Sequence, residues 1–522
     1  MTTFDRLSLL SVVGVAALLR IPGIESRGQF DADQGHDMAT LVAFTRDGVV
    51  PLLGPRTSVG EFHHGAFYYY LLAPASAISG GNPVAVTLFI ALLGIAAVAL
   101  TWWLARSMGG RVAGPVAGLV AGTLLAVSPA AIVESTFIWN PNPIGFFAVL
   151  SIAAAWKAWT SGRAGWWALA IAAAGAVTQL HVLGVVFLVA MLGIGVAEMR
   201  RDREVAAALL AGLLIVGLLF LPLLAYELRT DFAETRAVVA YLASDTGALG
   251  DPAGALALTL LRVVGWPLVG LVTEVPQLAG IMVAITLGVV ALGDLRMRGA
   301  EATGLRWLAW ILGFSTIALA LVAPSLQRVV PGLPNDHYHA FLDPVVVLLL
   351  AIPAGDLFSR ASLSWREARR PAALAAVVIV GIAIAGVELV ALSRKPPKAD
   401  PDGGWPVMQA AGERVVRVAN GSPVFLVGLP DFKLPDAIGY PIEYAGGQVD
   451  ILVDRNRYPD IGMATVVVCD RLFEGPIGLP CGGPAEDALV ARLTAMGSGV
   501  GAPPSLIERF DASPRTSVSI YR

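Results

Sequence analysis

The sequence predicts an all-α polytopic membrane protein that carries a small α/β domain at its C-terminus. Of its 522 residues, 56% are hydrophobic, and the mean hydropathy is +0.70. A soluble chain of this length would need far more polar surface, so most of the chain is expected to lie in a bilayer. Near residue 395 the composition changes to a proline- and glycine-rich linker followed by short strand-like runs, which predicts the separate domain.

The charge balance excludes one class of partner. The formal net charge is −3, the isoelectric point is about 6.1, and basic residues form only short clusters in loops. Nucleic acid is therefore not expected as a partner. The apolar run Leu7–Leu19 is not followed by a small-residue cleavage site, so we expect it to be a retained first span. The high Ala, Gly, Val and Arg content is typical of a GC-rich bacterium.

Apolar runs of about 17 to 25 residues predict about eleven transmembrane helices. The run 165–199 fits a hairpin of two helices better than one helix, because a single helix would far exceed the bilayer thickness. The expected spans are 6–24, 84–106, 112–130, 143–161, 165–180, 182–199, 204–224, 278–294, 304–323, 339–358 and 372–393.

The distribution of Lys and Arg predicts the orientation. These residues collect in alternate short loops, which the positive-inside rule makes cytoplasmic. We therefore expect a multi-pass plasma-membrane protein with its N-terminus in the cytoplasm and its C-terminal domain outside. The loops that set this orientation contain Arg106 and Arg111; Lys157 and Arg163; Arg200, Arg201 and Arg203; Arg296, Arg298 and Arg306; and Arg360, Arg366, Arg369 and Arg370.

Two further apolar segments are expected to lie at the membrane interface or to re-enter. Phe67–Ser79 is short, is broken by Pro74, and begins with a tyrosine triplet expected at headgroup level. Leu256–Thr273 is interrupted by Arg262 and Pro267. The predicted organisation is a transmembrane domain over 1–394 with large external loops at 25–83 and 226–277, and an extracytoplasmic α/β domain over 395–522. Cys469 and Cys481, the two cysteines of the sequence, could form a lasting disulfide there.

The first external loop holds an unusual share of ionisable residues for a chain that is only 14% charged. Charged groups beside a membrane are costly, so this loop is the expected functional element. Asp31 and Asp33 could cap the amphipathic helix predicted over 34–46, or act on an acceptor hydroxyl as a catalytic base or orienting group. We expect one of the two to cap the helix and favour a catalytic role for Asp33, with Asp31 beside it.

Further along this loop lie candidates for phosphate binding. Glu61, His63 and His64 precede the tyrosine-rich segment, and Arg56 is close to them in the chain. They are either a solvated loop edge or the site of a phosphate leaving group. Tyr69, within the tyrosine-rich segment, is a further candidate for substrate contact.

Polar residues at the external ends of other spans extend the predicted cavity. Each has an ordinary structural alternative. Asn140 stands among prolines that are common at a helix start, and Gln179 and His181 could satisfy backbone groups at the hairpin tip. His337 could simply form an ion pair with the neighbouring Asp336. With the predicted topology, all six histidines fall on the external side. The candidates for substrate binding are Asn140, Gln179, His181, Arg328, His337 and Tyr338.

The sequence offers no support for a cofactor. No glycine-rich phosphate loop, paired CxxC or zinc-protease signature occurs in it. We therefore predict none, and a catalytic divalent metal is unsupported.

The order of these motifs resembles the GT-C membrane glycosyltransferases, in the group that contains protein O-mannosyltransferases and lipid A aminoarabinose transferases. That group has an acidic motif in the first external loop, a P-L-x-G-P and (H/K)-(G/P)-x-x-Y-Y-x-L run, and a late (R/H)-Y helix start. Here these read FDADQG, PLLGPRTSVGEFHHGAFYYYLLAP and HYHAFLDP. WNPNP and QLH are similar to a bacterial subgroup of family 39-like transferases. The resemblance covers roughly residues 15 to 350.

The resemblance implies a GT-C fold and inverting transfer of a sugar from a polyprenyl-phosphate donor. The acceptor would be an envelope glycan, lipid or protein on the external face of the bilayer. Asp33 matches the family's first-loop catalytic Asp, but Gln34 stands where many members have Glu. Asp31 or Glu61 would then supply the second carboxylate, and His64 matches the position that contacts the donor phosphate.

His337 and Tyr338 match the Arg-Tyr pair of the family's late helix start. Two other classes stand as alternative hypotheses. A secondary transporter would carry ionisable residues near the bilayer midplane, whereas here they lie at one end of the spans. A receptor or scaffold without catalysis would be compatible with the departure at Gln34.

Overall fold

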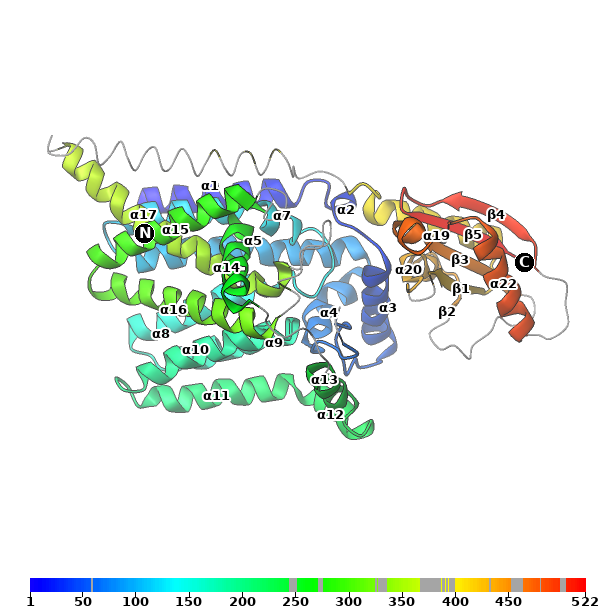
Figure 1. Ribbon diagram of the computed structural model, residues 1–522, viewed down its shortest axis with the longest axis horizontal. Coiled ribbons are helices and arrows are strands. Elements are labelled where there is room, and N and C mark those ends of the chain that lie inside the picture. The colour runs from blue at the N-terminus through cyan, green and yellow to red at the C-terminus, as the bar shows by residue number, and fades with distance from the viewer. Residues whose placement is uncertain are drawn as a thin grey trace.

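The computed structural model describes the chain except residues 58–59, 244–250, 271–275, 324–325, 327–335, 431–432, 452–462, 479, 498–503, and 367–399 apart from 386, 390 and 393. Long helices run side by side in a bundle, and a sheet-containing part lies at one end of it, which we call the sheet end (Figure 1). The helices of the bundle are α1 (Thr3–Arg20), α2 (Ile24–Arg27), α3 (Ala32–Asp47), α4 (Phe67–Ser79), α5 (Pro83–Met108), α6 (Gly114–Val127), α7 (Pro129–Val133), α8 (Ile144–Ser161), α9 (Trp166–Leu180), α10 (Gly184–Glu198), α11 (Glu204–Leu219), α12 (Leu221–Arg229), α13 (Ala233–Ala243), α14 (Pro252–Val269), α15 (Pro276–Arg296), α16 (Gly299–Val322), the 3-10 helix η2 (Asp336–Leu342) and α17 (Asp343–Arg366).

The predicted polytopic membrane architecture is confirmed, but the predicted number of spans is not. Among the described residues, six helices are long and apolar enough to cross a membrane, or seven if α11 and α12, bent by 46°, form one span. The predicted spans over α6, α9 and α10 are helices of only 14 or 15 residues. The predicted span 372–393 lies outside the described residues. The six helices are α5, α8, α14, α15, α16 and the segment His337–Ser362.

The hairpin predicted over 165–199 is confirmed. Helix α9 ends at Leu180, α10 begins at Gly184, and the turn between them contains His181. This turn places the two polar residues of the hairpin tip at the sheet end of the bundle.

The interfacial or re-entrant position expected for Leu256–Thr273 stays a prediction, but Arg262 and Pro267 do not break its helix. Helix α14 continues through Arg262 and Pro267 for 18 residues and is among the candidate spans. Its charge is accommodated because the buried guanidinium of Arg262 donates a hydrogen bond of 2.6 Å to the carbonyl oxygen of Leu326. Pro267 stands in the last turn, and its carbonyl oxygen accepts a hydrogen bond from Ser128. A buried arginine with a carbonyl partner therefore does not end this helix.

The first loop folds into α3 and α4, which pack together. Asp31 caps α3, because its carboxylate accepts a hydrogen bond of 3.2 Å from the backbone N–H of Asp33. The side chain of Gln34 accepts a bond of 3.0 Å from the N–H of Asp31 and completes a capping box. This confirms that one of the two acidic residues caps the helix. Helix α4 contains Pro74 and, with 13 residues, is too short to cross, as predicted.

Two members of the tyrosine triplet expected at headgroup level are covered by protein, and their depth in the membrane stays a prediction. Tyr68 and Tyr69 are buried between α3 and α4, and both donate to the carboxylate of Asp37, at 2.9 and 2.8 Å. Tyr70 is half-buried and donates to the carbonyl oxygen of Pro51. The packing of α3 on α4 therefore takes this aromatic surface away from the lipid.

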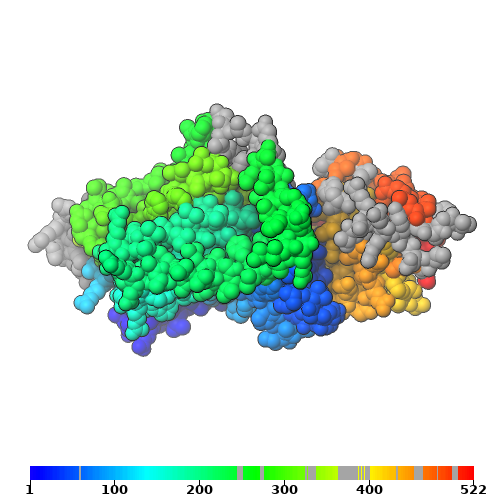
Figure 2. Space-filling view, turned by 90° about the horizontal axis from the view of Figure 1, so that it is seen from below, coloured from blue at the N-terminus to red at the C-terminus, as the bar shows by residue number. Residues whose placement is uncertain are grey.

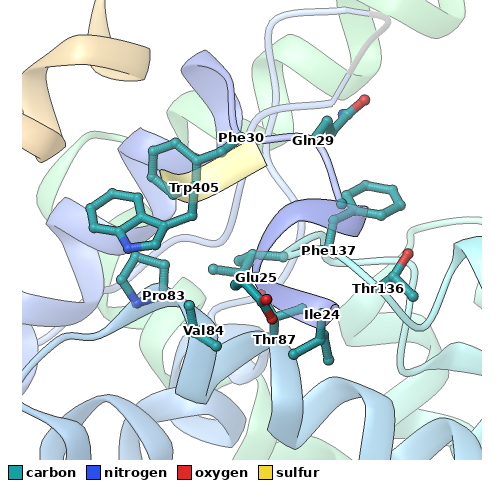
Figure 3. A pocket seen from close by; sticks show the side chains of 12 residues that line it. Ile24, Glu25, Gln29, Phe30, Pro83, Val84, Thr87, Thr136, Phe137 and Trp405 are labelled. Carbon is teal, nitrogen blue, oxygen red and sulfur yellow. The ribbon is translucent and has the colours of Figure 1, made fainter. Parts of the chain in front are cut away.

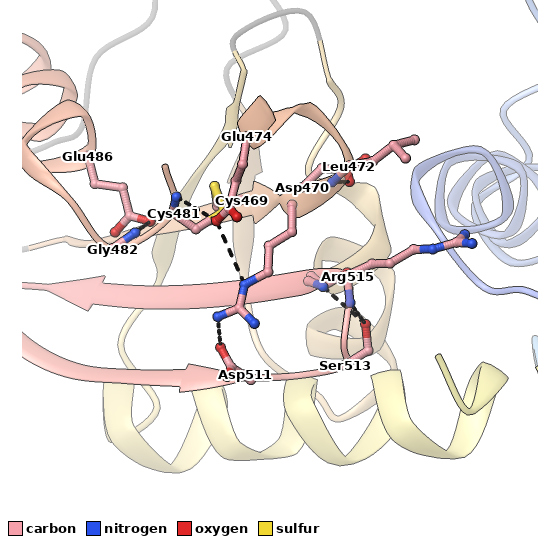
Figure 4. A network of polar contacts seen from close by, with 12 residues as sticks. Cys469, Asp470, Leu472, Glu474, Cys481, Gly482, Glu486, Asp511, Ser513 and Arg515 are labelled. Carbon is pink, nitrogen blue, oxygen red and sulfur yellow. Dashed lines mark hydrogen bonds and ion pairs between the residues drawn. A yellow bond between two sulfur atoms is a disulfide. The ribbon is translucent and has the colours of Figure 1, made fainter. Parts of the chain in front are cut away.

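The C-terminal part is a five-stranded mixed sheet with strand order β2-β1-β3-β5-β4. β1 pairs in parallel with β2 and β3, while β5 runs antiparallel to β3 and β4. Cys469, in β3, forms a disulfide with Cys481 (Figure 4). Two residues after Cys469 in the chain, Arg471 forms an ion pair of 2.5 Å with Asp511. The elements are α19 (Gly404–Ala419), β1 (Val424–Leu429), α20 (Asp436–Tyr444), β2 (Val449–Ile451), β3 (Ala464–Asp470), η3 (Arg471–Phe473), α21 (Glu474–Ile477), α22 (Pro484–Gly497), β4 (Leu506–Asp511) and β5 (Thr516–Tyr521).

The sheet-containing part is packed tightly on the first loop. Figure 2 shows the blue surface that includes α3 abutting the orange surface that includes α20. The ring of Phe30 meets that of Trp405 edge-on at 4.8 Å between centroids. A β-carbon added to Gly35 would lie 2.0 Å from the carbonyl oxygen of Asp436, so only glycine permits this approach. The first loop therefore lies between the bundle and the sheet.

Candidate functional site

Four of the predicted residues meet at the sheet end in one buried group, which we call the histidine cluster: His64, His181, His337 and Tyr338. The ring of His181 lies 4.9 Å from that of His64, 5.7 Å from that of His337 and 4.8 Å from that of Tyr338, between centroids. All four side chains are at least nine-tenths buried. Segments far apart in the sequence thus converge on one place.

Backbone contacts explain how the first loop reaches the hairpin tip. The N–H of His64 donates to the carbonyl oxygen of Pro55, and the N–H of Gly54 donates to the carbonyl oxygen of His64, both at 2.9 Å. Gly65 then donates to the carbonyl oxygen of Gln179 at 2.9 Å. A β-carbon on Gly65 would lie 1.9 Å from Oε1 of Gln179, so any larger residue would have to displace the Gln179 side chain.

The cluster and the adjacent Gln179 hold polar atoms that the described residues leave without hydrogen bonds. Nδ1 of His64 and both Oε1 and Nε2 of Gln179 are buried and have no such partner in the described part of the chain. Unpaired buried polar groups are costly and mark sites where a ligand or water belongs. Burial, reinforced by neighbouring His181 and His63, holds the pKa of His64 well below its usual range, so its ring is neutral near pH 7.

Asn140, the first asparagine of the WNPNP motif, holds the hairpin tip that carries His181. Nδ2 of Asn140 donates a hydrogen bond of 2.7 Å to the carbonyl oxygen of Leu180, at the end of α9. The ring of its neighbour Trp139 lies 4.4 Å from that of His337. Asn140 therefore fixes the hairpin tip in place, and Trp139 covers the histidine.

A second group, the acidic face, lies where α3 meets α20 and consists of Asp31, Asp33 and Asp436. Asp33 is exposed on the first turn of α3. Burial and the adjacent Asp33 carboxylate raise the pKa of Asp31 to about 6, although Lys433 opposes the rise. Asp436 is buried and lies 4.0 Å from Nδ1 of His36. The sheet-containing part thus contributes charged groups next to the predicted catalytic residues.

Sequence reasoning missed Asp37, which links the two groups. It is buried in the second turn of α3 and accepts hydrogen bonds from both tyrosines at the start of α4, four and five residues after His64. Burial raises its pKa to about 8, although both tyrosine hydroxyls oppose the rise. An acidic residue on the apolar face of an amphipathic helix, four residues after Asp33, was the available signal.

Other predicted residues have different partners. Arg56 and Glu61 are exposed and pair with each other. His63 is tied to α13, since its N–H and its Nδ1 lie 2.7 and 2.9 Å from the two carboxylate oxygens of Glu234. Tyr69 is engaged by Asp37, and Arg328 lies outside the described residues.

Two cavities open near these groups. The first is a small one, enclosed by Phe30, Trp405 and Phe137 at the junction of the first loop with the sheet-containing part (Figure 3). The second lies among α1, α5, α8 and the start of α17, and its lining includes Arg20, Asn142 and Asp343.

The comparisons with known proteins agree with this geometry. Residues 51–228, which include the first half of the histidine cluster, match the dolichyl-phosphate-mannose-protein mannosyltransferase family. No curated protein sequence matches the chain. The fold is similar to that of ArnT from Cupriavidus metallidurans in the apo state, with a TM-score of 0.59, 14% identity and coverage of 98% of this chain and 97% of that one.

Two further solved structures are similar. One is the same ArnT bound to undecaprenyl phosphate, with a TM-score of 0.58, 14% identity and coverage of 99% and 98%. The other is the Archaeoglobus fulgidus oligosaccharyltransferase in complex with Zn and sulfate, with a TM-score of 0.55, 13% identity and coverage of 94% of this chain and 70% of that one. The chain has the GT-C fold of membrane glycosyltransferases. Within that class, its sequence similarity is to the protein mannosyltransferases.

Proposed function

We propose that this protein moves a sugar from a polyprenyl-phosphate donor to an acceptor hydroxyl at the sheet end, on the extracytoplasmic face of the membrane. The observation that carries the proposal is the histidine cluster with the adjacent Gln179, because side-chain atoms of His64 and Gln179 are buried without hydrogen bonds from the described residues and both residues lie within the family match. The similarity to an ArnT that was solved with undecaprenyl phosphate supports the donor class.

The cluster suits a phosphate through hydrogen bonds more than through charge. The ring of His64 is neutral, so it can donate one N–H to a phosphate oxygen while Nε2 of Gln179 donates another. Both side chains are more than nine-tenths buried, so neighbouring groups must move to admit the donor. The developing charge on the leaving phosphate would then meet oriented donors in a site that excludes water.

The acidic face supplies the base in this proposal. Asp33, exposed at the first turn of α3, removes the proton of the acceptor hydroxyl. The acceptor oxygen attacks the anomeric carbon from the face opposite the phosphate, and the bond between that carbon and the phosphate oxygen breaks. Polyprenyl phosphate leaves with the electron pair, and the new glycosidic bond is inverted.

We also propose that residues 395–522 form a separate extracytoplasmic domain. The disulfide between Cys469 and Cys481 supports this side, because disulfides persist outside the reducing cytoplasm. Residues 1–394 would form the transmembrane domain, with the cytoplasmic N-terminus that the loop charges predict.

Transfer of labelled sugar from a panel of polyprenyl-phosphate donors, in membranes that contain the wild type or a variant, tests the function. Asp33→Asn should lower the rate by about 100- to 10,000-fold, because it removes the base and keeps the shape. Asp47→Asn, at the exposed far end of the same helix, is the matched control and should keep the wild-type rate. Unchanged transfer in Asp33→Asn, with equal protein in the membrane, would assign the base elsewhere. Absence of transfer from every donor would favour a transporter or scaffold.

A further inference from the structure

His36 lies about one helical turn after Asp33, the proposed base, on α3. Side chains three residues apart in a helix lie on the same face, with their β-carbons about 5–6 Å apart. Asp33 is exposed, and 52% of the His36 side chain is exposed as well. Both groups can therefore contact a molecule that binds in front of this face of α3.

The sheet-containing part places a buried carboxylate beside His36. Helices α3 and α20 lie side by side at the junction, and Asp436 is the first residue of α20 (Figure 1). Oδ1 of Asp436 lies 4.0 Å from Nδ1 of His36. The other carboxylate oxygen, Oδ2, is buried and accepts no hydrogen bond from the described residues. A buried acceptor without a donor is costly, so this carboxylate can accept a hydrogen bond from the imidazole at a gain in free energy.

The close fit of the two helices fixes this carboxylate next to α3. A β-carbon added to Gly35, the residue before His36, would lie 2.0 Å from the carbonyl oxygen of Asp436. Burial raises the pKa of Asp436, His36 opposes the rise, and Asp33 adds to it. Asp436 therefore lies within electrostatic range of both the proposed base and the histidine.

We propose that His36 binds the acceptor beside Asp33, and that Asp436 is a positioning residue that orients the imidazole ring. This role rests on the proposed function and adds its acceptor site. Hydrogen bonds of catalytic groups often tighten when substrate binds, so a small turn of the exposed ring lets Nδ1–H donate to Asp436. Nε2 is then the unprotonated nitrogen, and it can accept a hydrogen bond. The sheet-containing part thereby completes the site on α3.

The acceptor then meets two hydrogen-bond acceptors on one face of α3. The proton of the attacked hydroxyl goes to Asp33, as in the proposed reaction, and His36 takes no proton. A second O–H or N–H group of the acceptor, next to that hydroxyl, donates to Nε2 of His36. Two contacts hold the acceptor in one orientation, so less entropy has to be lost on the way to the transition state. The class of acceptor is therefore a compound with two neighbouring donor groups.

Initial rates of transfer at saturating donor, in membranes that contain each variant, test this role. The donors are decaprenyl phosphates that carry mannose, glucose, galactose or arabinose, and rates are compared with the one that the wild type uses best. His36→Ala should lower the rate by about 10- to 100-fold, because the acceptor loses a hydrogen bond and its orientation. His36→Gln places an amide oxygen near the position of Nε2 and should be at least about threefold faster than His36→Ala. Asp47→Ala, exposed in the last turn of α3, is the matched control and should keep the wild-type rate.

A double-mutant cycle shows whether Asp436 acts through His36. Asp436→Asn keeps the shape of the side chain, but its amide can present an N–H to Nδ1 and favour the other tautomer of the ring. It should lower the rate by about tenfold in the wild type and by less than about twofold in His36→Ala, because the group through which it acts is then gone. Glu443→Gln, at an exposed site on α20, is the control and should keep the wild-type rate.

Binding of decaprenyl phosphate to the purified full-length chain in lipid nanodiscs separates the acceptor from the donor. The dissociation constant should be the same in the wild type, His36→Ala and Asp436→Asn. Weaker binding in His36→Ala would overturn the acceptor role, because it would place the histidine at the donor. A wild-type rate in His36→Ala, or an equal effect of Asp436→Asn in both backgrounds, would overturn the pair and leave the proposed function intact. A wild type that transfers sugar from no donor would overturn the proposed function itself and, with it, this acceptor site.

Discussion

Nε2 of Gln34 donates a hydrogen bond of 2.9 Å to the carbonyl oxygen of Ile138, which is 104 residues away in the sequence. The other end of the same amide accepts from the N–H of Asp31. One fully buried side chain thus joins the start of α3 to the loop that supports the histidine cluster. Glutamine at this position has a structural task that needs both a donor and an acceptor.

Gln34→Glu, which introduces the residue common in similar enzymes, should therefore destabilise this protein. An ionised glutamate keeps the acceptor but cannot donate to Ile138, and it buries a charge. The expected loss is about 1–3 kcal/mol in the free energy of unfolding. Thermal unfolding in detergent measures it, with Gln277→Glu at an exposed site as the control. If Gln34→Glu were as stable as the wild type and more active, Gln34 would have no structural task, and a carboxylate at this position would aid catalysis.

The raised pKa of Asp31 predicts a pH dependence of activity. Its carboxyl titrates near pH 6 in the folded protein, against an ordinary value of 3.8, so ionisation costs stability and this cost disappears as the pH falls below about 4. If ionised Asp31 assists Asp33, the transfer rate should fall as the pH drops through 6. Asp31→Asn keeps a good helix cap and should lack that acidic limb. A limb that survives the substitution would exclude Asp31 as its source.

Asp37 predicts a pH dependence of stability at the alkaline side. Burial raises its pKa to about 8, so the folded protein holds a proton there that the unfolded chain releases near pH 4. Its contribution to stability is complete below about pH 4 and is lost as the pH rises through 8. The melting temperature of the wild type should therefore fall between pH 7 and 9. Asp37→Asn should fall less over that interval, whereas Asp47→Asn should behave like the wild type.

The contact between α3 and α20 can be tested at Gly35. Gly35→Ala adds a methyl group that would lie 2.0 Å from the carbonyl oxygen of Asp436, and a backbone atom cannot yield as a flexible side chain does. The sheet-containing part should shift away from α3, so protease cleavage between 395 and 404 should accelerate and transfer should fall. Gly280→Ala, on α15, where an added β-carbon would meet no atom within 4 Å, should do neither. Normal protection in Gly35→Ala would show that the contact is looser than described.

A double-mutant cycle tests the link between α13 and the first loop. His63 and Glu234 make two contacts below 3 Å, and Glu234 is buried, so the pair should be coupled by about 0.5–3 kcal/mol. The unfolding free energies of His63→Ala, Glu234→Ala and the double variant give this energy. An additive result would mean that the pair does not hold α13 in place.

The sequence carried the periodic and local features of this fold well. Span-length apolar runs, the hairpin at His181 and the cap at Asp31 follow from hydropathy and from short-range hydrogen bonds, which a sequence displays directly. The burial of Arg262 and of the Tyr68–Tyr69 pair was not predictable in this way. Each has a hydrogen-bond partner from another element, and such partners come from tertiary packing.

In the candidate site, too, local features were predictable from the sequence and tertiary contacts were not. That His64, His181 and His337 lie on one side was predictable from the alternation of charged loops. Their convergence depends on the backbone hydrogen bond from Gly65 to Gln179, and the role of Asp37 depends on the packing of α3 against α4. Neither is visible in the spacing of motifs. The proximity of Lys433 and Asp436 to Asp31 and Asp33 could not be predicted, because nothing in the sequence specifies where the sheet docks.

The docking of the sheet on the first loop has an evolutionary consequence. At Gly35, Phe30 and Gly81 the loop fits particular groups of Asp436, Trp405 and Tyr440. A tail transplanted from a distant relative would meet a loop shaped for another surface. Loop and tail are therefore expected to be inherited as a matched pair, and chimaeras should work only when both segments are exchanged together.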